Sequence, residues 1–211
     1  MKKILFQGDS ITDVLRDRSS DRYLGSGYPT VVAANVAVEH PGEYMFMNRG
    51  VSGDRIVDVY ARMKRDIINL KPDIVSILIG INGVWHEISE HNGVSAEKFE
   101  RIYDMLMDEL TKALPETKFM LLEPFVQYGC VTCPCEEHPD RWEIYQRETP
   151  LRAQATRRVA EKYHATFVPL QQAFDEASQK APSEYWLVDG VHPTTCGYGL
   201  IAREWIRHAD L

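Results

Sequence analysis

Short apolar runs alternate with longer amphipathic stretches along the chain. The short runs are rich in Ile, Val, Leu, Met and Phe, which is typical of parallel strands that are buried on both faces. They cover residues 3–7, 44–48, 74–80, 118–123 and 166–170. The longer stretches repeat apolar residues at helical spacing, and Pro72 and Pro115 follow two of them, where a helix should stop. They cover residues 28–39, 54–70, 96–114, 142–163 and 195–209.

This alternation predicts one α/β domain. Strands and helices that follow each other regularly form a parallel sheet with helices on both faces, joined by right-handed crossovers. We therefore expect a three-layer α/β/α sandwich with a central sheet of roughly five strands. The sequence contains no internal repeat, low-complexity tract or linker that would divide it, so residues 1–211 are predicted to form a single domain, a length at which folding buries about 70% of the unfolded chain's surface.

Polar residues follow the first three predicted strands. Ser10 comes after the first strand, Gly53 lies in the loop after the second, and Asn82 follows the third. In an open α/β sheet these loops meet at the edge where ligands bind. Each residue also admits a structural interpretation, because Ser and Asp cap helices and Asn-Gly is a common turn pair. We interpret Asp9 as structural, since its carboxylate can accept hydrogen bonds from nearby backbone N–H groups.

A carboxylate and an imidazole lie close together just before the last predicted helix. Asp189 and His192 are three residues apart, so that one loop can present both side chains. A serine becomes a nucleophile when a neutral imidazole takes its proton, and a carboxylate on the other ring nitrogen fixes the tautomer. The sequence therefore predicts Ser10 as the nucleophile, His192 as its base and Asp189 as the residue that orients the base. The structural alternative is that Asp189 and His192 form a surface turn ahead of Pro193.

Four blocks of the sequence resemble the GDSL or SGNH hydrolase superfamily. They are GDSIT, NRGVSGD, GIN and DGVHP, in the order of that family. The stretches KPDIVSILIGINGVW, LLEPF and VHPTTCGYGLIAREW are most similar to bacterial carbohydrate acetylesterases, including those that deacetylate xylan fragments. One position departs from the family pattern: Gly83 stands where the third block usually has aspartate, which leaves the anchoring of that loop open.

The resemblance implies a flavodoxin-like fold and a serine esterase that hydrolyses short-chain esters, here O-acetyl groups on sugars, through an acyl-serine intermediate. It also implies that the backbone N–H groups of Ser10 and Gly53 and the side-chain amide of Asn82 bind the substrate's oxyanion. No cofactor and no metal is expected. Two alternatives stay open: a lysophospholipase or thioesterase acting on longer acyl groups on the same scaffold, and a noncatalytic binding protein.

Charge and hydropathy limit the partners. The formal net charge is −7 and no Lys- or Arg-rich block is present, which argues against nucleic acid. No apolar run is long enough to span a bilayer, and the run at 4–6 is too short for a secretory signal. We expect a cytoplasmic protein with a small-molecule ester as its substrate, and relatives of this kind make a homo-oligomer plausible.

Two further groups of residues have both a chemical and a structural interpretation. Cys130, Cys133, Cys135 and His138 offer four zinc ligands, although their spacing is uncommon for a structural site, and reduced thiols in a loop are the favoured interpretation. Several aromatic residues fall near the expected active edge, where they would either line the pocket and stack on sugars or simply pack. These are Trp85, His86, Tyr128, Trp142 and Trp186.

Overall fold

The computed structural model describes residues 1–21 and 23–211. Within them, five parallel strands form one sheet in the order β2-β1-β3-β4-β5. The strands are β1 (Lys2–Gly8), β2 (Tyr44–Asn48), β3 (Ile74–Leu78), β4 (Lys118–Leu122) and β5 (Thr166–Val168). This is the flavodoxin-like order, in which the direction of winding reverses between β1 and β3. The predicted fold class is confirmed, and the reversal point is where Ser10 and Asn82 follow their strands.

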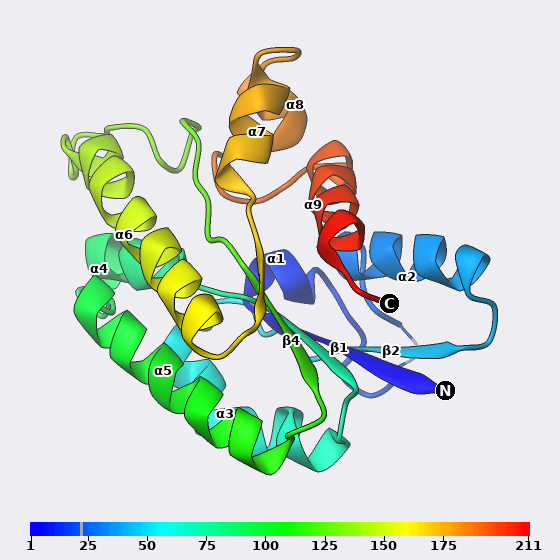
Figure 1. Cartoon of the computed structure of the whole chain (residues 1–211). Coiled ribbons are helices and arrows are strands. Elements are labelled where there is room, and N and C mark those ends of the chain that lie inside the picture. Colours follow the sequence, from blue (N-terminus) through cyan, green and yellow to red (C-terminus); the bar gives the residue numbers. More distant parts are fainter. Residues whose placement is uncertain (22) are drawn as a thin grey trace.

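Helices cover both faces of the sheet (Figure 1). One face packs against α2 (Tyr28–Glu39) and α9 (Thr195–His208). The other packs against α3 (Ile56–Asp66), α5 (Ala96–Ala113) and α6 (Arg141–Lys162). Successive side chains of a strand point to opposite faces, so that each strand contributes to two separate apolar cores.

Strand β1 shows this division. Ile4 and Phe6 belong to the core beneath α2 and α9, whereas Leu5 belongs to the core beneath α3 and α5, and all three are fully buried. The largest buried side chain, Trp205 of α9, packs against Phe6, and its indole N–H donates to Ser76 Oγ at 3.0 Å. The polar atom of this buried ring is therefore satisfied within the core.

Several elements differ from the sequence-based expectation. The helix expected over 54–70 is divided: α3 ends at Asp66, and a 3-10 turn follows at η1 (Ile68–Leu70). The strand expected over 74–80 stops at Leu78, and Gly80 then turns the backbone with a φ of +144°. Pro150 lies inside α6 without ending it. Four short helices were not predicted: α1 (Ser10–Asp13), α4 (Asn82–Glu90), α7 (Gln171–Ser178) and α8 (Ser183–Trp186).

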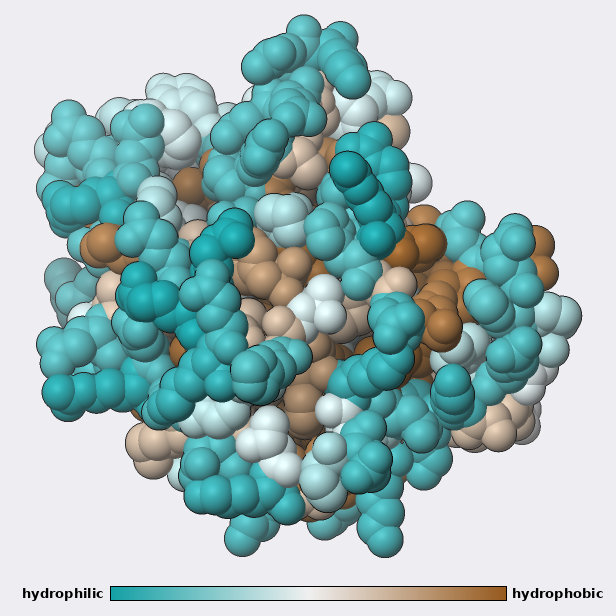
Figure 2. Space-filling model, viewed as in Figure 1, coloured by the Kyte–Doolittle hydropathy of each residue, from teal (hydrophilic) through white to brown (hydrophobic). Residues whose placement is uncertain are grey.

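The surface seen in Figure 2 is mostly hydrophilic, and apolar residues show beside α2 and in the hollow between α6 and α9. Within residues 1–21 and 23–211, none of the helices combines the length and the apolar composition that crossing a bilayer requires.

Candidate active site

The turn after β1 places Ser10 at the first position of α1. Gly8 adopts a φ of +155°, and a Cβ at this position would lie 2.2 Å from the carbonyl oxygen of Leu78 on the neighbouring strand. Only glycine lets the backbone leave the sheet so tightly. Asp9 then caps the helix, because its Oδ1 accepts from the N–H of Ile11 at 3.0 Å. The structural role predicted for Asp9 is present.

Ser10, His192 and Asp189 form a continuous chain of hydrogen-bonding groups. Ser10 Oγ lies 3.0 Å from His192 Nε2, and His192 Nδ1 lies 2.7 Å from Asp189 Oδ2. The other oxygen of Asp189 accepts from the backbone N–H groups of Val191 and His192 at 2.9 and 2.8 Å. The carboxylate therefore fixes both the imidazole and the loop that carries it.

The pKa values of the two titratable groups shift in opposite directions. The hydrogen bond to Asp189 raises the pKa of His192, and partial burial opposes this less strongly. Burial alone would raise the pKa of Asp189, but the hydrogen bonds from His192 and from the backbone outweigh it and lower that pKa. The carboxylate thus stays ionised while the imidazole is a better proton acceptor than a free histidine.

The segment that follows β4 holds the loop of Asp189 and His192 in place. Gln127 N–H donates to the carbonyl of Gly190 at 2.9 Å, and Val131 N–H donates to that of Asp189 at 3.1 Å. Gly190 has a φ of +100°, and a Cβ there would lie 2.5 Å from the Gln127 carbonyl oxygen. The close approach of these two segments explains the glycine of the last block.

The three predicted oxyanion donors all have hydrogen-bonding capacity that the described residues do not use. In the described part of the chain, the backbone N–H groups of Ser10 and Gly53 have no protein acceptor. Gly53 has a φ of +85°, a left-handed conformation that other residues rarely adopt. Asn82 Nδ2 donates one hydrogen to the carbonyl of Asp54 at 3.0 Å, which orients the amide and leaves its second hydrogen available.

Arg152 of α6 occupies the space beside Gly83. A Cβ on Gly83 would lie 3.1 Å from Arg152 Nε, so the guanidinium fills the position to which a side chain at 83 would point. Arg152 is 2% exposed, donates to the carbonyl of Val94 and pairs with Glu148 at 3.1 Å. The anchoring left open by the departure from the family block is therefore supplied here by an arginine of a distant helix.

Trp85 and His86 both lie at the site. The Trp85 ring contacts His192 edge to face, with 5.7 Å between ring centroids. His86 Cε1 is the nearest atom, at 3.9 Å, to the position of a Cβ on Gly53. Both side chains therefore lie next to predicted site residues, and Trp85 also packs against the core. Trp186 instead packs, with its indole N–H on the carbonyl of Ala177.

Two polar residues whose roles were not predicted, the buried Asn48 and the half-buried Arg62, hold the loop that carries Gly53. Asn48 donates to the carbonyls of Thr12 and Leu24 and accepts from the N–H of Gly50, which ties the glycine loop to α1. Arg62 pairs with Asp54 at 2.6 Å, next to Gly53. The sequence signal for Asn48 is its place at the start of the NRGVSGD block and at the end of an apolar strand, whereas Arg62 lies outside the four blocks.

Asp9 is more than a cap. It is 1% exposed, and burial raises its pKa to about 7, although the hydrogen bond from Ile11 and the charge of His192 oppose the shift. The charge of Asp9 in turn contributes to the raised pKa of His192. The nucleophile's immediate neighbour is thus a carboxyl group that titrates near neutrality.

The cysteine-rich loop does not gather its side chains around one point. The Cys130 thiol is exposed, and Cys135 Sγ accepts from Arg141 Nη2 at 2.8 Å. Among the described residues, no group of three or more His, Cys, Asp or Glu side chains is placed to hold a metal ion.

The fold and the arrangement of Ser10, His192 and Asp189 define a class of serine-type hydrolase. The sequence model of the GDSL-like Lipase/Acylhydrolase family matches residues 6–200. The chain belongs to this family, and it is a carboxylic ester hydrolase.

Its relatives include an acetylxylan esterase of Geobacillus stearothermophilus, which is 32% identical over 98% of this chain and 93% of the relative. The crystal structure of Axe2, an acetylxylan esterase from the same organism, covers 100% of this chain and 94% of its own, with a TM-score of 0.84 and 32% identity. LAE5, an alpha/beta hydrolase enzyme from the metagenome of Lake Arreo, Spain, gives a TM-score of 0.83 at 28% identity, covering 98% of this chain and 94% of its own. Two Axe2 structures are of catalytic mutants, in which a histidine or a serine is replaced by alanine.

Proposed function

We propose that the protein removes O-acetyl groups from sugars or short oligosaccharides. The observation that carries the proposal is the Ser10, His192 and Asp189 chain, with contacts of 3.0 and 2.7 Å, in a fold shared along its whole length with acetylxylan esterases. The proposal includes a single domain over residues 1–211 and a cytoplasmic location, which the four free thiols support. Self-association of the chain stays a prediction.

The proposed reaction uses the contacts among Ser10, His192 and Asp189. Ser10 Oγ attacks the ester carbonyl carbon while His192 Nε2 takes its proton, and Asp189 stabilises the resulting imidazolium. The carbonyl oxygen becomes an oxyanion, which accepts from the N–H groups of Ser10 and Gly53 and from the Asn82 amide. His192 then gives its proton to the leaving sugar hydroxyl, and the acetyl group stays on Ser10. Water, deprotonated by the same histidine, attacks this acyl-serine and releases acetate.

The acyl side of the site should be small. The Trp85 ring contacts His192, and His86 lies against Gly53, so two bulky side chains flank the position of the carbonyl. A methylene that the pocket cannot accommodate changes transition-state binding by about 1 to 3 kcal/mol. An acetyl ester should therefore be favoured over a butyryl ester by about tenfold or more.

The test is a panel of 4-nitrophenyl esters from acetate to octanoate, together with acetylated xylose and xylo-oligosaccharides, assayed with the purified protein. We expect kcat/KM to fall steeply with acyl length and acetate to be released from the sugars. Ser10→Ala should fold normally and lose activity by several orders of magnitude. Faster hydrolysis of octanoyl esters or acyl-CoA would replace this proposal with the lipase or thioesterase alternative, and a folded, active Ser10→Ala protein would overturn the mechanism.

A further inference from the structure

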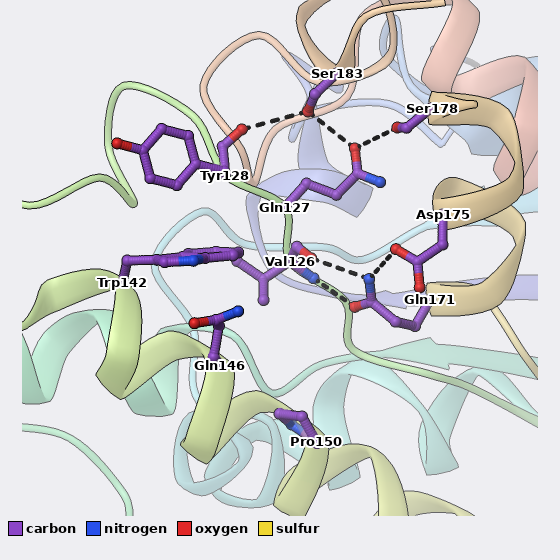
Figure 3. A pocket seen from close by; sticks show the side chains of 10 residues that line it. All are labelled: Val126, Gln127, Tyr128, Trp142, Gln146, Pro150, Gln171, Asp175, Ser178 and Ser183. Atoms are coloured by element: carbon purple, nitrogen blue, oxygen red, sulfur yellow. Dashed lines mark hydrogen bonds between the residues drawn. The ribbon is translucent and has the colours of Figure 1, made fainter. Parts of the chain in front are cut away.

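We propose that a pocket between α6 and α7 binds a sugar ring at a site separate from Ser10. This α6/α7 pocket has a volume of about 420 Å³, within the usual range for ligand sites. Its walls include Gln127, Tyr128, Trp142, Gln146, Gln171 and Asp175 (Figure 3), and none of the proposed catalytic or oxyanion-binding residues lines it. It thus brings together two aromatic residues that the esterase site does not use.

An aromatic face forms one side of the α6/α7 pocket. The Trp142 indole reaches from α6 toward Val126, with Gln146 on the next turn of the same helix (Figure 3). The Tyr128 ring meets Trp142 edge to face, with 5.4 Å between centroids and 85° between planes, which holds the indole in one orientation. A sugar ring presents apolar C–H groups on its flat side, and a fixed aromatic face is their natural packing partner.

Polar groups on the opposite side have unused hydrogen-bonding capacity. Gln171 bonds the backbone of Val126 through both ends of its amide and donates to Asp175 Oδ1 at 2.9 Å. This fixes the Asp175 carboxylate and leaves its second oxygen without a partner among the described residues. On α6, the exposed Gln146 amide has no partner among them either. Sugar hydroxyls donate and accept at once, so a carboxylate and an amide across the pocket suit them.

The charge of the residues that line the α6/α7 pocket disfavours anionic ligands. Among the described residues that line the α6/α7 pocket, none is Lys, Arg or His, and Asp175 is the one acidic side chain. A phosphate or carboxylate ligand would meet repulsion and no counter-charge. An acyl chain would offer no hydrogen bond to the Gln146 amide or to the second oxygen of Asp175. A neutral polyhydroxylated ring satisfies both surfaces.

The pocket also touches the frame of the esterase site. Gln127 belongs to its wall, and its backbone N–H donates to Gly190, between Asp189 and His192. Its side-chain Oε1 accepts from Ser178 and Ser183 at 2.8 and 2.9 Å, which binds this wall to α7 and α8. A sugar held here would anchor an oligosaccharide on the same frame that carries His192. This role as an anchoring subsite rests on the proposed function, whereas sugar binding itself does not.

Binding is tested first, with a sugar that carries no ester. Unacetylated xylotriose is titrated into the whole protein by isothermal calorimetry and by tryptophan fluorescence. Gln146→Ala should raise Kd by about 3- to 10-fold, as the loss of one neutral hydrogen bond predicts. The matched control is Gln154→Ala, which removes an exposed glutamine from the same helix outside the pocket. An equal Kd in both variants, or no saturable binding to the wild type, would overturn the proposal.

A second arm separates this proposal from the esterase function. Ser10→Ala should bind xylotriose with the same Kd as the wild type. Gln146→Ala should raise KM for acetylated xylo-oligosaccharides by about the same factor as it raises Kd for xylotriose. Its kcat/KM for 4-nitrophenyl acetate should be unchanged. Binding without any sugar deacetylation would refute the esterase proposal alone. Deacetylation with unchanged oligosaccharide KM in Gln146→Ala would refute the pocket alone. An aromatic face beside a carboxylate also suits organic cations, so choline is titrated in parallel. A sugar site would be contradicted if choline binds saturably, Gln146→Ala abolishes this binding, and xylotriose does not bind.

Discussion

Replacing Asp9 with asparagine removes a buried carboxyl group while keeping its cap. Asparagine is as good an N-cap as aspartate, and its side-chain oxygen can accept the same hydrogen bond from Ile11, which measures 3.0 Å in the wild type. The substitution therefore isolates the cost of ionising a side chain that is 1% exposed. We expect Asp9→Asn to change how stability depends on pH more than it changes the fold.

The magnitude follows from the two pKa values of the group. The carboxyl titrates near 3.8 in an unfolded chain, and burial raises its pKa to about 7 in the folded protein. Between these pH values the folded state binds more protons than the unfolded state, so the free energy of unfolding falls as the pH rises. Protonated Asp9 contributes its full share of the folding stability below pH 3.8. Between pH 3.8 and pH 7 the free energy of unfolding falls by about 1.4 kcal/mol per pH unit. The total loss by pH 7 is about 4 kcal/mol, of which about 3 kcal/mol occurs above pH 5.

The assay is urea unfolding of the wild type and Asp9→Asn, followed by circular dichroism at pH 5 and pH 8. The free energy of unfolding of the variant minus that of the wild type should be about 3 kcal/mol larger at pH 8 than at pH 5, because the wild type loses stability over this range and the variant does not. Asp17→Asn is the control, because hydrogen bonds from Ser19 lower the pKa of Asp17 and its titration is complete below pH 5. A difference between wild type and Asp9→Asn that is the same at both pH values would refute the reasoning.

Two further substitutions test the reaction steps. Asn82→Ala should lower kcat by about 10² to 10³ with little change in KM, because the amide bonds the oxyanion more strongly than the ground-state carbonyl; initial rates with 4-nitrophenyl acetate measure this, and an unchanged kcat would remove Asn82 from the site. Asp189→Asn should lower kcat by about 10⁴. Catalysis needs neutral His192, and Asp189 is the main cause of the raised pKa of His192. In Asp189→Asn the acid limb of the plot of kcat/KM against pH should therefore move to lower pH. An acid limb that stays in place or moves to higher pH would contradict this.

The strands and long helices could be predicted from the sequence because a single physical pattern governs them. Buried parallel strands such as β3 are buried at every position and apolar at all but Ser76, and amphipathic helices such as α3 repeat with the helical period. The short helix α4 gave no such signal. It begins with Asn82 and Gly83, which read as a turn pair, and its polar residues look like a loop.

Ser10, Gly53 and Asn82 could be predicted as site residues because strand ends converge at one edge of a parallel sheet. Asp189 and His192 follow α8 rather than a strand, and their prediction rests on their spacing and on the DGVHP block. The structure brings Ser10 and His192 together across 182 positions of the chain.

The roles of the supporting residues could not be predicted, because Arg62 and Asn48 act through contacts that depend on tertiary packing. Asn48 opens the NRGVSGD block, but the block does not say what its side chain contacts, and Arg62 belongs to none of the four blocks.

Helix α4 shows how a missing motif residue and a distant helix are linked. Glycine at position 83 disfavours a helix on its own, by about 1 kcal/mol relative to alanine. It also leaves room for Arg152, which a Cβ would approach to 3.1 Å. The Arg152 guanidinium donates to the backbone carbonyl of Val94. The backbone N–H of Val94 donates to the carbonyl of Gly83. The start of α4, and with it the Asn82 amide, is therefore held by the packing of α6, a dependence that no local pattern around residues 80–83 contains.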